Sequence, residues 1–172
     1  MTALVVYESL WGNTAAIAHA ISEGIGEGTV VRHTGEITPA EAATAELLVL
    51  GAPVHAFSLP SAATKKSVAE RRLAPGDLAP DLSQPPLKAW LEDLPAATAV
   101  AAAFDTRVRG PLGHGGASKI EKLLEQRGYR IADHSQGFYI INEKNVKAAG
   151  SMLRPGEIDR ARKWGQLLAS RV

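Results

Sequence analysis

The apolar residues of this chain gather in short runs, most of which contain no polar residue. These runs occupy residues 3–7, 29–32, 47–51, 99–104 and, in two pieces, 129–131 and 137–141. A strand that is apolar on both faces is typical of a parallel sheet covered by helices on both sides. The pattern therefore predicts five strands.

Between the runs, the apolar residues change to helical spacing. Ile17, Ile21 and Ile25 recur every four residues before a glycine-rich stretch, which predicts a helix that ends close to residue 25. The other predicted helices start at Thr38, Leu87, Ser118 and Pro155. The starts at Thr38 and Ser118 are Ser/Thr-x-x-Glu capping boxes, in which each end residue bonds the other's backbone N–H.

Strands and helices alternate along the chain, which predicts an α/β fold. The expected architecture is a three-layer sandwich, a five-stranded parallel sheet with helices on both faces. Its 172 residues suit a single domain, residues 1–172. Residues 74–86 contain four prolines and are expected to form an exposed loop. Residues 142–154 are polar without a period and predict a loop or an edge decoration.

Composition removes several classes of function. The chain has no cysteine, which excludes thiolate metal sites, disulfides and cysteine nucleophiles. Nineteen Lys and Arg against 18 Asp and Glu leave a net charge of +1, so neither nucleic acid nor a membrane is an expected partner. No apolar run approaches the roughly 20 residues of a membrane span, and the N-terminus lacks the pattern of a secretory signal. We expect a cytoplasmic protein, and the histidine spacings predict no metal site.

In an open parallel sheet, ligands bind beyond the carboxyl ends of the strands, where the strand order reverses. The loops to consider are a first loop at residues 8–14, a second at 52–60 and a third at 105–117. The first loop reads Ser9-Leu10-Trp11-Gly12-Asn13-Thr14 after Glu8. Its hydroxyl, amide and N–H groups at a helix start suit a phosphate group, although the same groups also cap helices. The lysine of a nucleotide-triphosphate loop and the Gly-x-Gly-x-x-Gly motif are both missing.

Residues 5–18 resemble the flavodoxin signature, in which an apolar strand and an aromatic residue lead into Ser/Thr-x-x-Gly-x-Thr and a helix. The resemblance extends over nearly the whole chain. It implies the sheet order 2-1-3-4-5 and FMN as the cofactor.

The same resemblance assigns residues to the cofactor. Those implied for the phosphate are Ser9, Trp11, Asn13 and Thr14, through side chains or N–H groups, and Leu10 and Gly12, through the backbone. Those implied along the isoalloxazine ring are Pro53, Val54, His55, Ala56 and Phe57. Phe57 is the candidate for stacking on the ring or else fills the edge of the core, and His55 either contacts the flavin or faces water.

The third loop differs from that of electron-carrier flavodoxins, because it offers cations and no tyrosine. Its implied cofactor residues are Asp105, Thr106, Arg107, Gly113 and His114. Arg107 or Arg109 beside the N1–O2 edge of the flavin would raise its two-electron potential. The segment Gly113-His114-Gly115-Gly116 is similar to the His-Gly-Gly of flavodoxin-fold NAD(P)H:quinone oxidoreductases, where the histidine lies over the flavin. These glycines equally suit a simple turn.

The function that this resemblance implies is electron transfer or two-electron reduction of quinone-like acceptors. In many flavodoxins a glycine-containing peptide of the second loop turns over on reduction and stabilises the one-electron-reduced flavin. The second loop here has no glycine between Pro53 and Pro60, which favours two-electron chemistry. Expected partners are a redox protein, or NAD(P)H and a small acceptor. The basic residues Lys65, Lys66, Arg71 and Arg72 either steer such a partner or form the solvated face of a helix. The alternative is a flavodoxin-fold domain that has lost FMN and acts as a binding or regulatory module.

Two other classes of protein, response-regulator receivers and hydrolases, need residues that this chain lacks. A response-regulator receiver needs an acidic pair after its first strand and an aspartate at the end of its third, where this chain has Glu8-Ser9 and Gly51-Ala52. Ser9, His55 and Asp105 follow three different strands, as hydrolase residues do, but no Gly-x-Ser-x-Gly elbow accompanies them. Neither class is expected.

Overall fold

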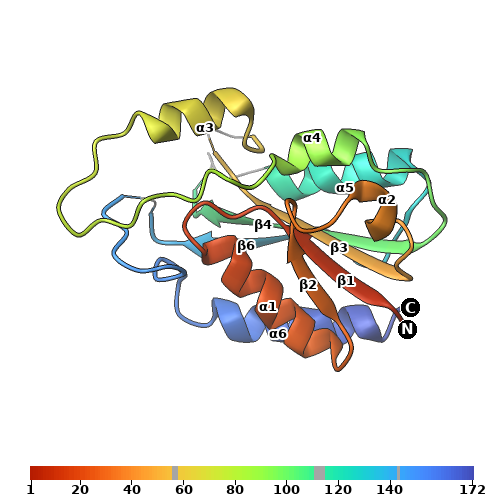
Figure 1. Cartoon of the computed structure of the whole chain (residues 1–172). Coiled ribbons are helices and arrows are strands. Elements are labelled where there is room, and N and C mark those ends of the chain that lie inside the picture. Colours follow the sequence, from red (N-terminus) through yellow and green to blue (C-terminus); the bar gives the residue numbers. More distant parts are fainter. Residues whose placement is uncertain (56–57, 111–114, 143) are drawn as a thin grey trace.

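A sheet lies between two layers of helices in the computed structural model, which describes residues 1–55, 58–110, 115–142 and 144–172 (Figure 1). The strands are β1 (Ala3–Tyr7), β2 (Val30–His33), β3 (Leu47–Pro53), β4 (Val100–Val108), β5 (Arg130–Ile131) and β6 (Gln136–Ile140). The helices are α1 (Asn13–Ile25), α2 (Pro39–Ala42), α3 (Ala62–Ala69), α4 (Leu87–Glu92), α5 (Gly116–Gln126) and α6 (Glu157–Ala169).

The strands are parallel and follow the order β2-β1-β3-β4-β5, with β6 also paired to β4. The predicted order 2-1-3-4-5 is therefore confirmed. The fifth strand is divided in two, as the two apolar pieces of the sequence indicate. β5 lies beside Val100 and Ala101 at the start of β4, whereas β6 lies beside its last five residues, from Phe104 to Val108.

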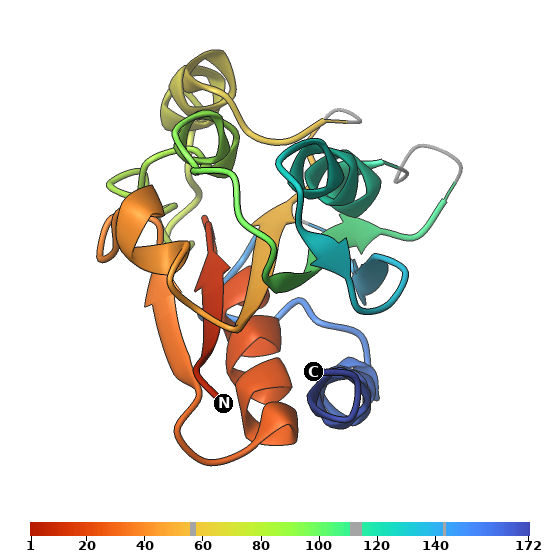
Figure 2. The same ribbon diagram turned by 90° about the vertical axis from the view of Figure 1, so that its right-hand side faces the viewer.

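Each face of the sheet packs against its own set of helices, so the core has two main layers (Figure 2). Val5 faces the layer of α1 and α6, together with Ile17 and Trp164. Its neighbour Val6 faces the layer of α2, α4 and α5, together with Trp90. Because alternate residues of one strand enter two apolar layers, the central strands contain no polar alternation.

The predicted start of α5 at Ser118 is wrong, because the helix begins at Gly116 after Gly115. A capping residue from another strand replaces the local capping box: the carboxylate of Asp105 accepts a hydrogen bond of 2.7 Å from the N–H of Ala117. The carboxylate of Glu121, which the box would use, instead accepts the N–H of Ser135 at 2.6 Å. By contrast, the capping box at Thr38 is present as predicted.

The segments at residues 74–86 and 142–154 form no helix or strand in their described parts, as expected, but they are not simply exposed. Their apolar side chains pack against the first loop and α3 in a third, smaller cluster. Its members are Leu10, Trp11, Val68, Val146, Leu78, Leu82 and Met152. The two segments also meet through the N–H of Leu78, which donates to the carbonyl of Val146 at 2.6 Å. Both lie beyond the carboxyl ends of the strands, at the left in Figure 1.

Candidate functional site

The parallel strands bring the three predicted loops together at one edge of the sheet. Hydrogen bonds join them in pairs. The hydroxyls of Thr14 in the first loop and Thr106 in the third lie 2.8 Å apart, and both residues are buried. The N–H of Val54 in the second loop donates to the carbonyl of Thr106 at 2.9 Å. A ligand held by the first loop would therefore meet the other two.

The non-helical part of the first loop ends at Gly12, which adopts a left-handed conformation with φ 81° and precedes the first turn of α1. A residue with a Cβ is strained in this conformation, and glycine is not. A Cβ at this position would also lie 2.9 Å from both the Ala149 Cβ and the Gly150 N. The turn therefore requires glycine for its backbone angle and for the close approach of the 142–154 segment.

Several backbone N–H groups beside this turn have no hydrogen-bond acceptor among the described residues. Within the described part of the chain, none of the N–H groups of Leu10, Trp11, Asn13, Thr14 and Ala15 donates to a protein atom. The N–H of Gly12 donates to the hydroxyl oxygen of Ser9 at 3.1 Å, which leaves the Ser9 O–H available as a donor. Unbonded N–H groups and the positive end of a 13-residue helix together favour an anion such as a phosphate group.

The unbonded N–H groups around Gly12 form a cradle for an anion. Some side chains of the first loop contribute to this cradle, and others pack behind it. Leu10 and Trp11 pack their side chains into the third cluster. The side-chain oxygen of Asn13 accepts the N–H of Met152 at 3.2 Å and thus holds the 142–154 segment. Of the side-chain groups that the resemblance implies for the phosphate, the hydroxyls of Ser9 and Thr14 and the side-chain NH₂ of Asn13 remain candidates.

The second loop turns sharply directly after β3. The backbones of His55 and Ser58 exchange two hydrogen bonds of 2.9 Å each, which closes a tight turn. His55 is 8% exposed, so it does not face water, and its ring lies 5.9 Å from that of Trp11. Ala56 and Phe57, for which contact with the flavin is expected, lie outside the described residues.

In the third loop, Asp105 and Arg107 form an ion pair rather than two separate charges. The guanidinium donates to both carboxylate oxygens at 2.5 Å, and the Asp105 side chain is fully buried. The charge of Arg107 is thereby offset, which leaves the exposed Arg109 as the stronger candidate for raising a flavin potential. The other two implied residues, Gly113 and His114, lie outside the described part of the chain.

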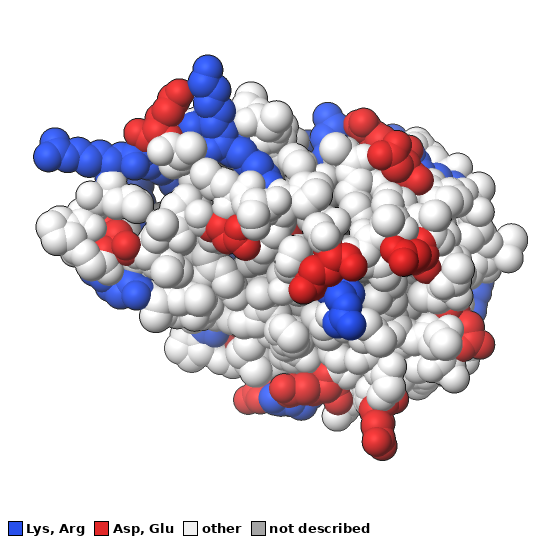
Figure 3. Space-filling view, viewed as in Figure 1, with Lys and Arg blue, Asp and Glu red and all other residues white. Residues whose placement is uncertain are grey.

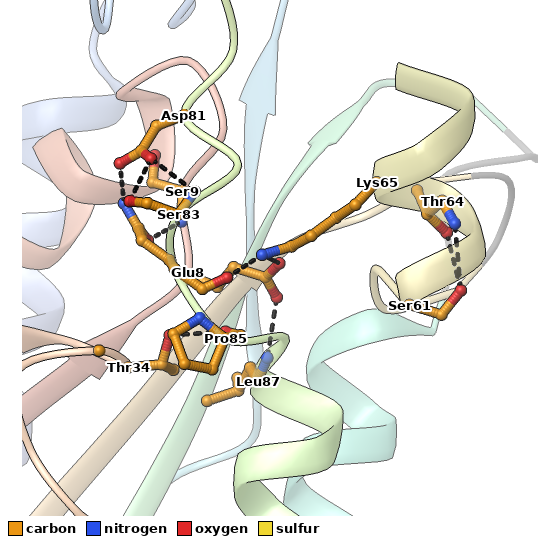
Figure 4. Close-up of polar contacts among 12 residues, drawn as sticks. Glu8, Ser9, Thr34, Ser61, Thr64, Lys65, Asp81, Ser83, Pro85 and Leu87 are labelled. Atoms are coloured by element: carbon orange, nitrogen blue, oxygen red, sulfur yellow. Dashed lines mark hydrogen bonds and ion pairs between the residues drawn. The ribbon is translucent and has the colours of Figure 1, made fainter. Parts of the chain in front are cut away.

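Sequence reasoning missed a buried polar network beneath the first loop (Figure 4). Glu8 has no exposed surface, and its carboxylate accepts the N–H of Leu87 at 2.9 Å and lies 3.6 Å from the ammonium of Lys65. The Lys65 ammonium also donates to the carbonyl of Gln84. Burial raises the pKa of Glu8, and the Leu87 N–H and Lys65 offset this effect only in part. A glutamate at the end of an apolar strand was a visible signal, whereas nothing in the sequence marked Gln84.

The mouth of the site is basic. A hollow of about 470 Å³ opens at the end of β4, lined by Arg71, Val108, Asn142, Lys144 and Asn145. The Arg71 guanidinium lies 5.8 Å from the centre of the Trp11 ring. Figure 3 shows Lys and Arg side chains projecting from this end of the molecule, over α3 and the segment after it.

Among helices of the described residues, none is long and apolar enough to cross a membrane.

Comparison with solved structures gives matches over the whole chain. A flavodoxin 2 from Bacillus cereus superimposes with a TM-score of 0.69 and 15% identity, covering 100% of both chains. A flavodoxin from the domain Archaea gives 0.65 and 18% identity, over 99% of this chain and 97% of the other. The chain has a flavodoxin-like fold. A WrbA-like flavodoxin from Agrobacterium tumefaciens gives 0.55 and 19% identity, over 98% and 95% of the two chains. No family model and no curated protein matches the sequence.

Proposed function

We propose that this flavodoxin-like protein binds FMN at the carboxyl edge of its sheet and works as a redox protein. The observation that supports this most directly is the row of unbonded N–H groups around Gly12, at the place where the fold presents its ligand loops. The cradle suits a single phosphate group, which fits FMN.

The residues present fit this cofactor. The Ser9 and Thr14 hydroxyls and the N–H groups at the start of α1 would hold the phosphate, and charge-assisted hydrogen bonds of this kind are the stronger ones. Bound FMN supplies a centre that accepts and donates one or two electrons. Pro53, Val54 and His55 would line the flavin on the side of the second loop.

We further propose two-electron reduction of quinone-like acceptors, with NAD(P)H or a redox partner protein as the electron source. The basic mouth supports this proposal, because Arg71 and Lys144 would attract an anionic donor or acceptor. Arg109 would favour the anionic, fully reduced flavin and raise its two-electron potential.

FMN and riboflavin titrations of the purified protein test the proposal, with flavin fluorescence as the readout. We expect FMN to bind about 100-fold more tightly or better, because several charge-assisted hydrogen bonds to the phosphate are worth about 1.5–3 kcal/mol each before desolvation. Equal affinity for the two would contradict the phosphate assignment. A colourless protein that binds neither would favour the alternative, a domain that has lost FMN and acts as a binding or regulatory module.

A further inference from the structure

The carbonyl groups of the first loop are held away from its cradle by the two irregular segments. The carbonyl of Leu10 accepts the N–H of Asp81 at 2.8 Å, and the carbonyl of Trp11 accepts the N–H of Gly150 at 2.9 Å. In a trans peptide the C=O and the following N–H point in opposite directions. Anchoring the Leu10 carbonyl to the 74–86 segment therefore turns the N–H of Trp11 to the opposite side. This arrangement removes a repulsive oxygen from the anion and presents a donor in its place.

Gln84 connects this anchor to the loop itself. Its side-chain NH₂ donates to the carboxylate of Asp81 at 2.8 Å, and its side-chain oxygen accepts the N–H of Ser9 at 2.8 Å. Burial raises the pKa of Asp81, but hydrogen bonds from Ser83 and Gln84 outweigh it and lower the pKa, so the acceptor is charged at neutral pH. Gln84 is only 6% exposed, and a buried amide with both ends bonded has a single orientation.

The buried ion pair beneath the loop holds Gln84 in turn. The Lys65 ammonium reaches from α3 to the carbonyl of Gln84 and to the carboxylate of Glu8, and its side chain is only 12% exposed. Glu8 accepts the N–H of Leu87, so the chain is held on both sides of Pro85 and Pro86. Replacing a buried ion pair by apolar residues often leaves stability unchanged or higher, which makes pure stabilisation a weak explanation for this one.

We infer that Gln84, held by the Glu8–Lys65 pair, is a positioning residue that keeps the first loop in its anion-accepting conformation. The inference rests on the proposed phosphate site and adds to it a specific requirement. The affinity for a phosphate monoester depends on residues of α3 and the 74–86 segment that do not touch the phosphate. The cradle sets the class of ligand. Gln84, Lys65 and Glu8 together form a brace, which sets how well the cradle is preformed.

The test compares Gln84→Met and Lys65→Met with two matched controls, Gln126→Met and Lys163→Met, whose wild-type side chains are exposed. We expect each brace variant to bind FMN about tenfold more weakly and riboflavin within about twofold of wild type, because one hydrogen-bond geometry is worth about 1.4 kcal/mol. The controls should match wild type. Loss of overall stability alone would weaken both ligands equally, and that result would overturn the inference.

A second measurement does not require FMN. Amide hydrogen exchange of the ligand-free protein reports the loop directly, because the N–H of Ser9 is bonded to Gln84 and that of Gly12 to Ser9. In Gln84→Met we expect faster exchange at both amides, with the interior of α1 unchanged. Inorganic phosphate should shift the amide signals of Trp11 and Thr14 less in this variant than in wild type.

These readouts separate the two proposals. If wild-type protein binds no FMN, and Gln84→Met still speeds hydrogen exchange at the Gly12 amide, the proposed function is refuted and the inference about Gln84 is retained. Normal FMN binding by wild type and by both brace variants, with unchanged exchange at Gly12, would refute the brace and leave the function standing.

Discussion

The hydroxyl of Thr14 lies at the start of α1, 2.8 Å from that of Thr106, and the residue is buried. Thr14→Val keeps the shape and removes this hydroxyl. We predict about a tenfold loss of FMN affinity and little change for riboflavin, because one charge-assisted hydrogen bond is worth about 1.5–3 kcal/mol before desolvation. Thr29→Val is the control, since it also removes a hydroxyl hydrogen bond, to the Gly26 carbonyl outside the three loops. Equal losses for both flavins would contradict a phosphate contact by Thr14.

The raised pKa of the buried Glu8 carboxyl leads to an unusual prediction for the pH dependence of stability. Burial raises the pKa of its carboxyl, while the N–H of Leu87, Lys65 from α3 and His55 from the second loop lower it only in part. A carboxyl with a raised folded-state pKa binds its proton more tightly when folded. Its contribution to stability is therefore greatest below the ordinary glutamate pKa of about 4.3 and declines as the pH rises through the folded pKa.

Glu8→Gln removes this titration and keeps the shape. We predict that the free energy of unfolding of wild type, minus that of the variant, falls as the pH rises from the ordinary glutamate value and then becomes constant above the folded pKa. Urea denaturation at a series of pH values measures the difference, and the titration of other groups cancels in it. A difference that does not vary with pH would show that Glu8 titrates normally.

At the scale of elements, the central strands and α1 could be predicted because their apolar period is local. The start of α5 could not, since its capping group is Asp105 from a different strand, and a sequence motif shows only local partners. The bounds of α3 could not be predicted for a related reason. Its only buried residue is Val68, so it has no apolar stripe, and the ion pair of Lys65 fixes it instead.

The contact between α1 and α6 gives a prediction at this scale, because the helices approach through glycines. A Cβ on Gly165 would lie 2.2 Å from the carbonyl oxygen of Ile21, which is backbone and cannot move aside easily. Gly165→Ala gains up to about 1 kcal/mol of helix propensity but overpacks the contact by about 1–3 kcal/mol or more. We predict a net loss of stability in thermal or urea unfolding, with Gln166→Ala, at an exposed position, near wild type. A more stable Gly165→Ala would contradict this packing.

At the scale of the whole molecule, the sequence predicted that the three loops lie at one edge of the sheet but not what surrounds them. The strand order places the first, second and third loops at one edge, which follows from parallel pairing alone. The burial of Trp11 depends on side chains from residues 74–86 and 142–154. These segments have neither period nor capping motif, and only the folded chain brings them to the first loop.

The distribution of charge gives the last prediction. The net charge is only +1, so any steering must come from where the charges lie. Lys66 lies on α3 and Arg72 follows Arg71, which lines the basic hollow; both side chains are exposed, and within the described residues neither forms an ion pair. Arg130 pairs with Val100 at the start of β4, the opposite edge of the sheet. Two double variants change the net charge equally but at different distances from the mouth. One is Lys66→Glu with Arg72→Glu, and the other is Arg130→Glu with Lys163→Glu.

We predict that the FMN-loaded protein, reduced and mixed with the anionic acceptor ferricyanide, reacts about three- to tenfold more slowly when Lys66 and Arg72 are reversed. The Arg130 pair of substitutions should have a smaller effect at the same low ionic strength, because field strength falls with distance and screening. Added salt should bring the rates together, since the Debye length shrinks to about 3 Å at 1 M. A neutral quinone should show little difference between the variants. If the two double variants slow ferricyanide equally, net charge governs the encounter, and the basic mouth has no steering role.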